Sequence, residues 1–515
     1  MAIPQDTNVL ILGLGSSGLA MARWCTRQGA SVTVADTRAQ PPQLDALRAS
    51  MPQAQFVSGA LSAALLEQVP AQLILKSPGL TPAQVAPVTA AAAERGTPVW
   101  GELDLFALAL ADLRTAQAYQ CDILAVTGTN GKTTVASLTA QLVERAGKSV
   151  ALAGNIGPTL LDTLSGHLDA STLPQVWVIE LSSFQLADMA GPGLPVTADL
   201  GAAAFEPTAA CVLNLSQDHL DWHTDMAAYA QAKARVFGTR ALMVLNRDDA
   251  AVMAMLPAPS KGQPLRRSTS VGAHLPQKPG EFGLESVNGM AWLVRAMQAD
   301  PTIRVRRGQQ AEPLHIQRLM PAEALRIRGR HNAVNALAAL ALASAAGCAL
   351  APVLYGLREY RGEPHRVESI AVLNEVEFFD DSKGTNVGAT VAAVTGLGAE
   401  RKLVVILGGD GKGQDFSPLA EPIRKNARAA ILIGRDAALI RAALESCGVA
   451  LFDASDMSHA VALAMRQAHS ADAVLLSPAC ASFDMFDNYR HRAQVFHDAV
   501  QALADAQGIV LEGSA

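Results

Sequence analysis

Short apolar runs alternate with longer amphipathic or alanine-rich stretches along the chain, and most of these runs end at a glycine-rich or polar turn. Such runs are typical of strands buried in a parallel sheet, and the stretches between them are typical of covering helices. The pattern therefore predicts an α/β protein with mainly parallel sheets. The runs that we interpret as strands cover residues 8–12, 31–35, 73–75, 123–126, 176–179, 211–213, 241–245, 376–379, 403–407, 429–433 and 473–476.

Three successive α/β domains are expected, because 515 residues exceed what one hydrophobic core ordinarily organises. We predict a Rossmann-like N-terminal domain at residues 1–115, a central ATPase domain of the P-loop type at 116–361 and a Rossmann-like C-terminal domain at 362–515. The stretch from 261 to about 320 has weak periodicity and predicts irregular strands and loops. The stretch 336–354 predicts a buried helix and not a membrane span, because it is mostly alanine and contains Gly347 and Pro352.

The composition is that of a globular protein, since 50% of the residues are hydrophobic and 17% are charged. A net charge of -6 without a long lysine or arginine tract argues against a nucleic-acid-binding surface. Six scattered cysteines without a C-x-x-C pair indicate reduced thiols buried in the core of a cytoplasmic protein. The first residues lack a signal-peptide pattern, so we expect no membrane insertion.

A glycine-rich turn links the strand at 123–126 to a helix that starts with a lysine and two threonines. Backbone N–H groups of such a turn can surround phosphate oxygens, and the helix dipole favours negative charge there. Lys132 would contact the β- and γ-phosphates, and the Thr133 hydroxyl could bind Mg²⁺. The sequence departs from the usual motif G-x-x-x-x-G-K-[ST], because Val126 stands in place of the first glycine. The alternative to a phosphate loop is an ordinary glycine turn between strand and helix. The proposed phosphate loop comprises Gly128, Thr129, Asn130, Gly131, Lys132, Thr133 and Thr134.

A second glycine motif, Gly13-x-Gly15-x-x-Gly18, follows the first strand, and Asp36 stands just after the second. The same pattern occurs in dinucleotide-binding turns, where an acidic residue binds a ribose. Close packing of a helix on a strand also selects glycine. The motif therefore indicates a nucleotide diphosphate without identifying which one.

Four polar residues of the central domain are further candidates. Glu180 closes a strand downstream of the phosphate loop, where a carboxylate can contact Mg²⁺ directly or through water. His219 lies in a loop with two aspartates and a second histidine, which supports a metal-linked role as much as a structural one. From its neighbours alone, Lys233 is interpreted as a surface lysine. Asn332 is most simply the N-cap of a helix.

Together these motifs resemble the Mur ligase family over nearly the whole chain. The run G-T-N-G-K-T-T is similar to that family's ATP loop, and H-N-x-x-N from His331, Pro364-His365-Arg366 and Asp381 follow in the family's order. Within the family, four segments resemble the branch that adds D-glutamate. These segments are Asp36-Thr37-Arg38 in a short first domain, residues 180–186 (E-L-S-S-F-Q-L), residues 381–386 (D-S-K-G-T-N) and residues 477–483 (S-P-A-C-A-S-F).

The resemblance implies an ATP-dependent ligase that joins D-glutamate to UDP-N-acetylmuramoyl-L-alanine in peptidoglycan synthesis, and we expect a monomer. The first domain would bind the UDP end of the precursor through Ser16, Ser17, Asp36, Thr37, Arg38, Ser77, Pro78 and Gly79. The middle domain would bind ATP through Gly128 to Thr134, Asn155, Asn332 and Asn335, with Arg366 and Asp381 closing from the third domain. D-Glutamate would be held by Lys383, Thr385, Lys412, Ser482, Phe483 and Tyr489, the last standing where the family more often has phenylalanine.

Two Mg²⁺ ions are also implied by the resemblance. Thr133 and Glu180 would hold one of them. His219 and Lys233 would hold the other, with the lysine carbamylated by CO₂ so that it offers oxygen ligands. The implied catalytic residues are Lys132, Glu180, His219, Lys233, Arg366 and Asp381.

Other classes of protein share part of these motifs. An NAD-dependent oxidoreductase would use the first glycine motif but leaves the ATP loop and the third domain without a role. A sister Mur ligase or a folylpolyglutamate-type ligase would share the ATP loop, although the latter should lack the UDP-type turn at its start. A non-enzymatic nucleotide-binding regulator would not need Lys233 or Asp381. The segments 189–207 and 261–307 are longer than usual for the family and have no predicted role.

Overall fold

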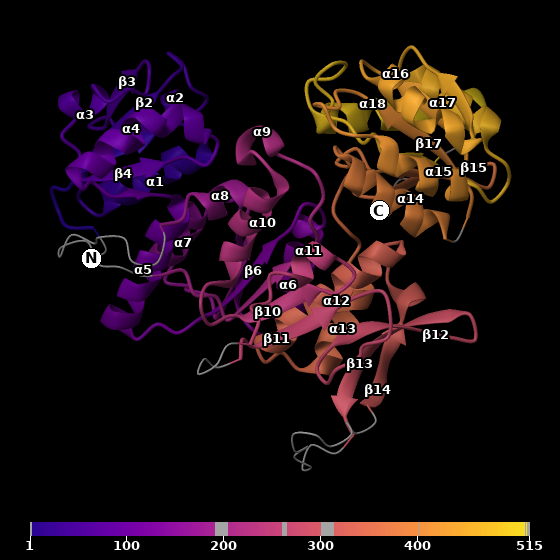
Figure 1. Ribbon diagram of the computed structural model, residues 1–515, viewed down its shortest axis with the longest axis horizontal. Helices are drawn as coiled ribbons and strands as arrows, with labels where there is room; N and C mark the ends of the chain where they lie inside the picture. Colours follow the sequence, from indigo (N-terminus) through magenta and orange to yellow (C-terminus); the bar gives the residue numbers. More distant parts are fainter. Residues whose placement is uncertain are drawn as a thin grey trace.

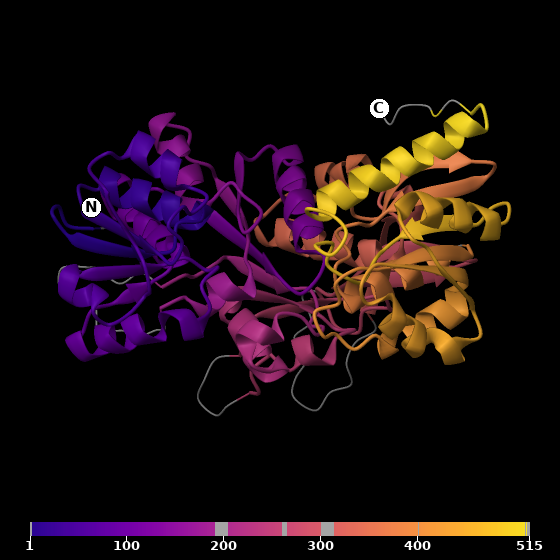
Figure 2. The same cartoon turned by 90° about the horizontal axis from the view of Figure 1, so that it is seen from above.

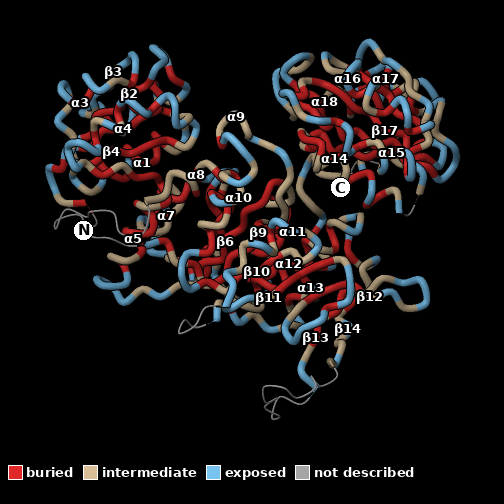
Figure 3. The backbone as a smooth tube through the Cα atoms, viewed as in Figure 1, coloured by how far each residue is buried: buried red, intermediate tan, exposed pale blue. Residues whose placement is uncertain are grey.

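Three lobes follow one another along the chain in the computed structural model, which describes residues 3–190, 204–259, 265–299, 314–399, 401–509 and 511. Each lobe contains a sheet whose buried strands lie between helices (Figures 1 and 3). This arrangement confirms the prediction of a three-domain α/β protein, whereas the exact domain limits remain predictions. Among the helices that the structure describes, none is both long enough and apolar enough to cross a bilayer.

The N-terminal sheet has five parallel strands in the order β3-β2-β1-β4-β5. The chain leaves β1 through Gly13, whose φ is 88°, and a Cβ on Gly18 would lie 2.0 Å from the Gly13 carbonyl oxygen. Glycine at both positions lets the helix start approach the strand end. The elements are β1 (Asn8–Leu12), α1 (Ser16–Arg27), β2 (Ser31–Asp36), α2 (Leu44–Ser50), β3 (Gln55–Ser58), α3 (Leu65–Gln68), β4 (Leu73–Lys76), α4 (Pro82–Arg95), β5 (Val99–Trp100) and α5 (Glu102–Gln117).

The middle lobe is built on six parallel strands in the order β11-β10-β9-β6-β8-β7, with β6 near the centre. The carboxyl ends of β6, β8 and β9 therefore lie side by side, which is where ligands bind in open α/β sheets. Its elements are β6 (Asp122–Thr127), α6 (Lys132–Arg145), β7 (Val150–Gly154), α7 (Leu160–Asp169), β8 (Val176–Glu180), α8 (Ser183–Ala187), β9 (Ala209–Val212), α9 (Leu220–His223), α10 (Met226–Ala234), β10 (Leu242–Asn246), α11 (Ala250–Met253) and β11 (Ser268–Val271).

Two sequence predictions for the rest of this lobe are corrected by the structure. The stretch expected to hold irregular strands and loops does contain strands, and three of them form one antiparallel sheet: β12 (Phe282–Val287), β13 (Met290–Gln298) and β14 (Leu314–Pro321). Residues 260–264 and 300–313 lie outside the described residues. A register shift in β13 buries Leu293 and Val294 in succession, which breaks the two-residue period. The expected single helix is two helices, α12 (Arg330–Ala345) and α13 (Leu350–Glu359), because Gly347 adopts a positive φ of 73° between them.

The C-terminal sheet has the order β15-β16-β20-β17-β18-β19, in which β15 pairs antiparallel with β16 and the other pairs are parallel. The loops after β16, β17 and β20 therefore meet at one edge of the sheet. The elements are β15 (Glu368–Leu373), β16 (Val376–Asp380), α14 (Val387–Gly398), β17 (Leu403–Gly408), α15 (Ala420–Asn426), β18 (Ala427–Ile433), α16 (Ala437–Leu444), β19 (Ala450–Asp453), α17 (Met457–Gln467), β20 (Ala473–Leu476) and α18 (Tyr489–Ala506).

The hydrophobic cores show which lobes are joined firmly. One continuous core contains residues of the N-terminal sheet, of α5 and of the middle sheet, and α1 packs on α7 across this junction. The C-terminal lobe has two cores of its own. Seen from above, the middle lobe lies between the two others (Figure 2). We therefore expect the first two lobes to move as one body and the third to move against them.

The cysteines partly follow the sequence prediction. All six are free thiols. Cys25, Cys211, Cys447 and Cys480 are buried, whereas Cys121 and Cys348 are only partly so.

Candidate active site

The phosphate loop follows β6, and side chains from the neighbouring strand end fix its backbone. Asn214 accepts the backbone N–H of Asn130 at 2.8 Å and donates its amide to the Asn130 carbonyl at 3.1 Å. The hydroxyl of Thr129 accepts the backbone N–H of Ser216 at 3.0 Å. Sequence reasoning assigned no role to Asn214, although its place directly beyond a strand was a signal.

Lys132 folds back over its own loop. Its Nζ donates to the carbonyl oxygens of Gly128 at 3.0 Å and Thr129 at 2.8 Å. Burial lowers the pKa of Lys132, and the nearby carboxylate of Glu180 opposes this effect. The ammonium group thus stands over the loop in which the sequence predicts phosphate oxygens.

Glu180 ends β8 next to this loop and is 1% exposed. Asn155 donates to its Oε1 at 2.9 Å. Its Oε2 is buried and has no hydrogen-bond partner among the described residues. A buried carboxylate oxygen without a partner is costly, and a bound cation would satisfy it, so Glu180 fits the predicted Mg²⁺ ligand.

Lys233 is 1% exposed, so the interpretation as a surface lysine was wrong. Its Nζ reaches beneath the phosphate loop, donating to the Gly128 carbonyl at 2.8 Å and lying 4.6 Å from the centroid of the Tyr229 ring. Burial lowers the pKa of Lys233 far below its usual value, and the charge of Lys132 adds to this. The alanine-rich context of α10 gave no sign of which face is buried.

His219 lies at the rim of the same region. Its φ is 55° at the start of α9, and its Nε2 lies 3.6 Å from Asp218 Oδ2. The ring is 6.5 Å from Tyr229, the aromatic ring over which Lys233 lies. His223 is buried instead, with its Nε2 2.8 Å from Ser183 Oγ. The structure therefore brings both His219 and Lys233 close to one tyrosine ring.

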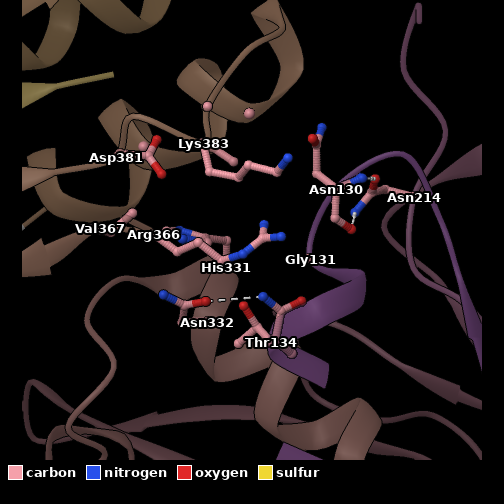
Figure 4. A pocket seen from close by; sticks show the side chains of 15 residues that line it. Asn130, Gly131, Thr134, Asn214, His331, Asn332, Arg366, Val367, Asp381 and Lys383 are labelled. Atoms are coloured by element: carbon pink, nitrogen blue, oxygen red, sulfur yellow. Dashed lines mark hydrogen bonds between the residues drawn. The ribbon is translucent and has the colours of Figure 1, made fainter. Parts of the chain in front are cut away.

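A pocket opens between the phosphate loop, the start of α12 and the C-terminal lobe (Figure 4). Arg366 Nη2 donates to Thr133 Oγ1 at 2.7 Å across the lobes. Asp381 and Lys383 lie on one side of the pocket, with Asn130 and Asn214 on the other (Figure 4). The predicted ATP residues that line it are Asn130, Gly131, Thr134, Asn332, Asn335, Arg366 and Asp381.

Asn332 is not an N-cap, because α12 begins at Arg330 after Gly329. Gly329 has a positive φ of 92° and is the N-cap, three residues earlier than expected. Asn332 instead lies buried in the first turn, where its amide donates to the Arg328 carbonyl at 2.8 Å. Asn335 donates to its Oδ1 at 3.0 Å. Linked amides at the floor of a pocket can pair with the edge of a purine.

A pair of asparagine amides also joins the middle and C-terminal lobes. Asn130 and Asn386 donate to each other's side-chain oxygens at 3.2 and 3.0 Å. Asn386 also caps α14 by accepting the backbone N–H of Ala389. The sequence segment containing Asn386 was noted, but this contact with the phosphate loop was missed.

The C-terminal side of the pocket is electrostatically unusual. Asp381 is 6% exposed and accepts a 2.7 Å hydrogen bond from Ser477. Burial raises the pKa of Asp381 to about 7 despite this bond, and the adjacent Asp380 adds to the rise. Burial also lowers the pKa of Lys383, whose Nζ lies 4.2 Å from the centroid of the Tyr489 ring.

The residues predicted for D-glutamate are only partly assembled. Lys383 and Tyr489 are in contact, and Ser482 is buried. Thr385 follows Lys383 in a tight turn, its N–H donating to the Lys383 carbonyl at 2.8 Å. Lys412 and Phe483 are exposed.

The residues predicted for the UDP precursor gather at one edge of the N-terminal sheet. Asp36 accepts the backbone N–H of Leu14 and two side-chain N–H groups of Arg38, each at 2.8 Å. Burial opposes ionisation, but these bonds hold the pKa of Asp36 at about 2. β1 and β4 pair in parallel, so the turn at Gly13 touches Ser77.

The other residues predicted for the precursor surround this edge. Ser16, Thr37, Arg38 and Gly79 are exposed, Pro78 is half-buried, and Ser17 contributes a hydrogen bond to Glu102. Lys76, just before Ser77, forms a buried 2.6 Å ion pair with Asp188 of the middle lobe. Sequence reasoning missed this pair because Lys76 ends an apolar run.

Comparison with known families matches three successive segments of the chain. Residues 7–101 match the Mur ligase MurD-like N-terminal domain, residues 126–343 the Mur ligase middle domain, and residues 365–480 the Mur ligase glutamate ligase domain. Together they span well over half of the chain. The protein therefore belongs to the Mur ligase family.

Two relatives of high identity carry the same protein name. The chain is 65% identical over 515 residues to "UDP-N-acetylmuramoylalanine--D-glutamate ligase" of Albidiferax ferrireducens, with 99% of each chain covered. It is 54% identical over 513 residues to the protein of that name from Ralstonia nicotianae, with 98% of each covered.

Solved structures support the fold. The alanine ligase MurC of Thermotoga maritima gives a TM-score of 0.52 at 18% identity, covering 96% of this chain and 99% of that one. MurF of Acinetobacter baumannii gives 0.55 at 16% identity, covering 97% and 91%. At these identities the likeness shows the shared fold alone.

Replacing Lys132 by alanine should weaken ATP binding by about 10- to 100-fold, because a charged contact to phosphate would be lost. Calorimetric titration of the full chain with ATP measures the effect. Lys425→Ala, which removes an exposed lysine of α15, serves as the control and should bind like the wild type. Equal affinity in Lys132→Ala and the control would contradict the phosphate-loop assignment.

Proposed function

We propose that the chain uses ATP to join D-glutamate to the alanyl carboxylate of UDP-N-acetylmuramoyl-L-alanine in peptidoglycan precursor synthesis. The observation that carries this proposal is the pocket in which the phosphate loop faces Arg366, Asp381 and Lys383. High identity to relatives named for this reaction, over nearly the full length, supports the choice of substrates. We place the reaction in the cytoplasm, where ATP is available. We expect a monomer to suffice, since one chain supplies every proposed contact.

The chemistry follows from the poor reactivity of a carboxylate. An oxygen of the alanyl carboxylate would attack the γ-phosphorus of ATP, breaking the bond to the β-phosphate oxygen and giving an acyl phosphate and ADP. The amine of D-glutamate would then attack the acyl carbon, and phosphate would leave from the tetrahedral intermediate as the nitrogen loses a proton. Lys132 would neutralise charge that develops on the phosphates, so catalysis depends mainly on positioning and electrostatics.

Cation sites are proposed for the side chains around the phosphate loop. Thr133 and Glu180 would hold one Mg²⁺, and the buried, unpartnered Oε2 of Glu180 supports this role. Bound Mg²⁺ would supply positive charge to the phosphate oxygens. Arg366 now donates to Thr133, so a nucleotide phosphate that gave Arg366 a new partner would release this hydroxyl.

Lys233 is proposed to carry a carbamate and to hold a second Mg²⁺ with His219. Attack on CO₂ requires the neutral amine, which then loses a proton as the carbamate forms. Burial and the neighbouring Lys132 both favour that neutral amine. The carbamate would turn a buried amine into an oxygen ligand, the kind that Mg²⁺ prefers.

The outer parts of the substrates would lie in the other two lobes. We propose that the turn at Gly13, the loop 77–79, Ser16, Ser17 and the Asp36–Arg38 segment bind the UDP end. Both carboxylates of D-glutamate would be met by basic groups, since Lys383 and Lys412 lie on the C-terminal side. Lys412 is exposed in this structure, so we propose that it reaches the amino acid when the C-terminal lobe closes.

Phosphate release by the purified protein tests the substrate assignment. We expect release in the presence of ATP, Mg²⁺ and UDP-N-acetylmuramoyl-L-alanine only when D-glutamate is added, and not with L-glutamate, L-alanine or meso-diaminopimelate. Release with another amino acid would move the chain to a sister activity. No release with any of them would contradict the ligase proposal.

Lys233→Ala should be nearly inactive in this assay, and a small carboxylate such as acetate should restore part of the activity by occupying the place of the carbamate. The exposed-lysine variant Lys425→Ala should keep wild-type turnover without acetate. Mass measurement of the gently handled wild type should reveal the added CO₂. Full turnover of Lys233→Ala without any added carboxylate would contradict the proposal that Lys233 carries a carbamate.

A further inference from the structure

A network of hydrogen-bonded side chains lies directly behind the two ATP residues of the C-terminal lobe, and no role proposed above uses it. Asp380 is fully buried at the end of β16. Its Oδ2 lies 2.7 Å from His365 Nδ1 and 3.2 Å from His497 Nε2, which comes from the C-terminal helix α18. Its Oδ1 accepts the backbone N–H of Ser382 at 2.9 Å.

Each end of this network adjoins a residue of the ATP pocket. His365 precedes Arg366, and Asp380 precedes Asp381. Asp380 is the last residue of β16, and successive side chains of a strand point to opposite sides. Asp380 therefore anchors in the lobe while Asp381 reaches the pocket. The hydrogen bond between His365 and Asp380 ties the two pocket residues to each other.

The backbone around Arg366 needs such an anchor. His365 and Val367 have positive φ values of 64° and 52°, a conformation that costs energy for residues other than glycine. Glu368 faces Asp380 across the β15–β16 ladder and accepts the backbone N–H of His365 at 2.8 Å. The network thus holds the strained turn that aims Arg366 at Thr133.

We propose that His365 and His497 act through Asp380 as positioning residues, which orient Arg366 and keep Asp381 ionised for ATP binding. This inference rests on the proposed ATP site. His497 is the informative member, because it touches Asp380 from a different element and has no place in the pocket itself.

The charges around Asp380 and Asp381 explain how the network would keep Asp381 ionised. Asp380 is faced by His365, His497 and the carboxylate of Glu368, and the buried guanidinium of Arg492 also acts on it. The two histidines and Arg492 offset the negative charge of Asp380, and the hydrogen bond to Asp380 raises the pKa of His497.

Asp381 is faced by Ser477, Arg366, Arg492 and Asp380. Two adjacent buried carboxylates repel each other. Removal of His497 would leave the charge of Asp380 less compensated, and the pKa of Asp381, already raised to about 7 mainly by burial, would rise further. The ionised form of Asp381 would then be lost at a higher pH than in the wild type.

A bound transition metal is the competing explanation. The ligand atoms of His365, Glu368, Asp380 and His497 lie within 4.8 Å of one another. Histidine nitrogens and carboxylates are common zinc ligands. Hydrogen bonds account for the contacts more simply, because nitrogen atoms approach the carboxylates of Glu368 and Asp380 at 2.7 to 2.9 Å in three of them, the ordinary length of such a bond.

The test compares His497→Ala and His497→Gln with the wild type in D-glutamate-dependent turnover at a series of pH values. Glutamine keeps an N–H donor near Asp380 but never carries a charge. We expect His497→Ala to raise KM for ATP by about 3- to 10-fold, as for loss of one hydrogen bond to a charged group, and to move the acid limb of kcat to higher pH. His497→Gln should restore KM for ATP while the acid limb stays displaced.

Matched controls separate this network from folding and from the proposed function. His491→Ala removes an exposed histidine of the same helix and should match the wild type in KM and in pH profile. Melting temperatures establish that the variants are folded. Inactivity of the wild type itself would count against the proposed ligase function and not against the network.

Three results would overturn the inference. One is a folded His497→Ala protein whose KM for ATP and acid limb both equal those of the wild type. Another is a His497→Gln protein that restores the acid limb as fully as KM, because the charge of His497 would then be irrelevant. The third is a wild-type profile that changes on treatment with a chelator and returns with Zn²⁺, which would indicate a metal centre instead.

Discussion

Two lysine side chains converge on one backbone carbonyl, and the rest of the site depends on this contact. Lys132 and Lys233 both donate to the Gly128 carbonyl of the phosphate loop, at 3.0 and 2.8 Å. Two buried ammonium groups this close would repel strongly. The structure resolves the conflict by favouring a neutral Lys233, since burial and the charge of Lys132 both lower its pKa. This direction agrees with the roles proposed for the two lysines, a charged Lys132 for phosphate and a neutral Lys233 amine for reaction with CO₂.

The division of the hydrophobic cores explains how the remaining parts reach this loop. A continuous core fixes the N-terminal lobe against the middle one, so the proposed UDP site and the phosphate loop keep a constant separation. The C-terminal lobe has its own cores and meets the phosphate loop through polar contacts such as Arg366 with Thr133 and Asn386 with Asn130. Polar contacts exchange readily for contacts with a nucleotide. The lobe can therefore close on ATP without disrupting a core.

The fold was largely predictable because buried parallel strands leave continuous apolar runs. The glycine positions of both nucleotide loops were also visible, since tight turns between strand and helix require them. Lys233 was misjudged because its alanine-rich helix has no clear polar face, and Asn332 because a glycine with a positive φ starts the helix earlier. Long-range contacts, such as Lys76 with Asp188 between two lobes or His497 with Asp380 within the C-terminal lobe, join residues far apart in sequence. No local pattern encodes them.

The central claim is that the precursor's carboxylate is activated on the phosphate loop by direct transfer of the γ-phosphate. The most direct measurement uses UDP-N-acetylmuramoyl-L-alanine whose alanyl carboxylate carries ¹⁸O at both oxygens, and follows the label by mass spectrometry of the released phosphate. One ¹⁸O atom is expected in each phosphate formed together with the D-glutamate amide, because the acyl phosphate breaks at its carbon–oxygen bond. Phosphate free of ¹⁸O, with amide formation intact, would contradict it.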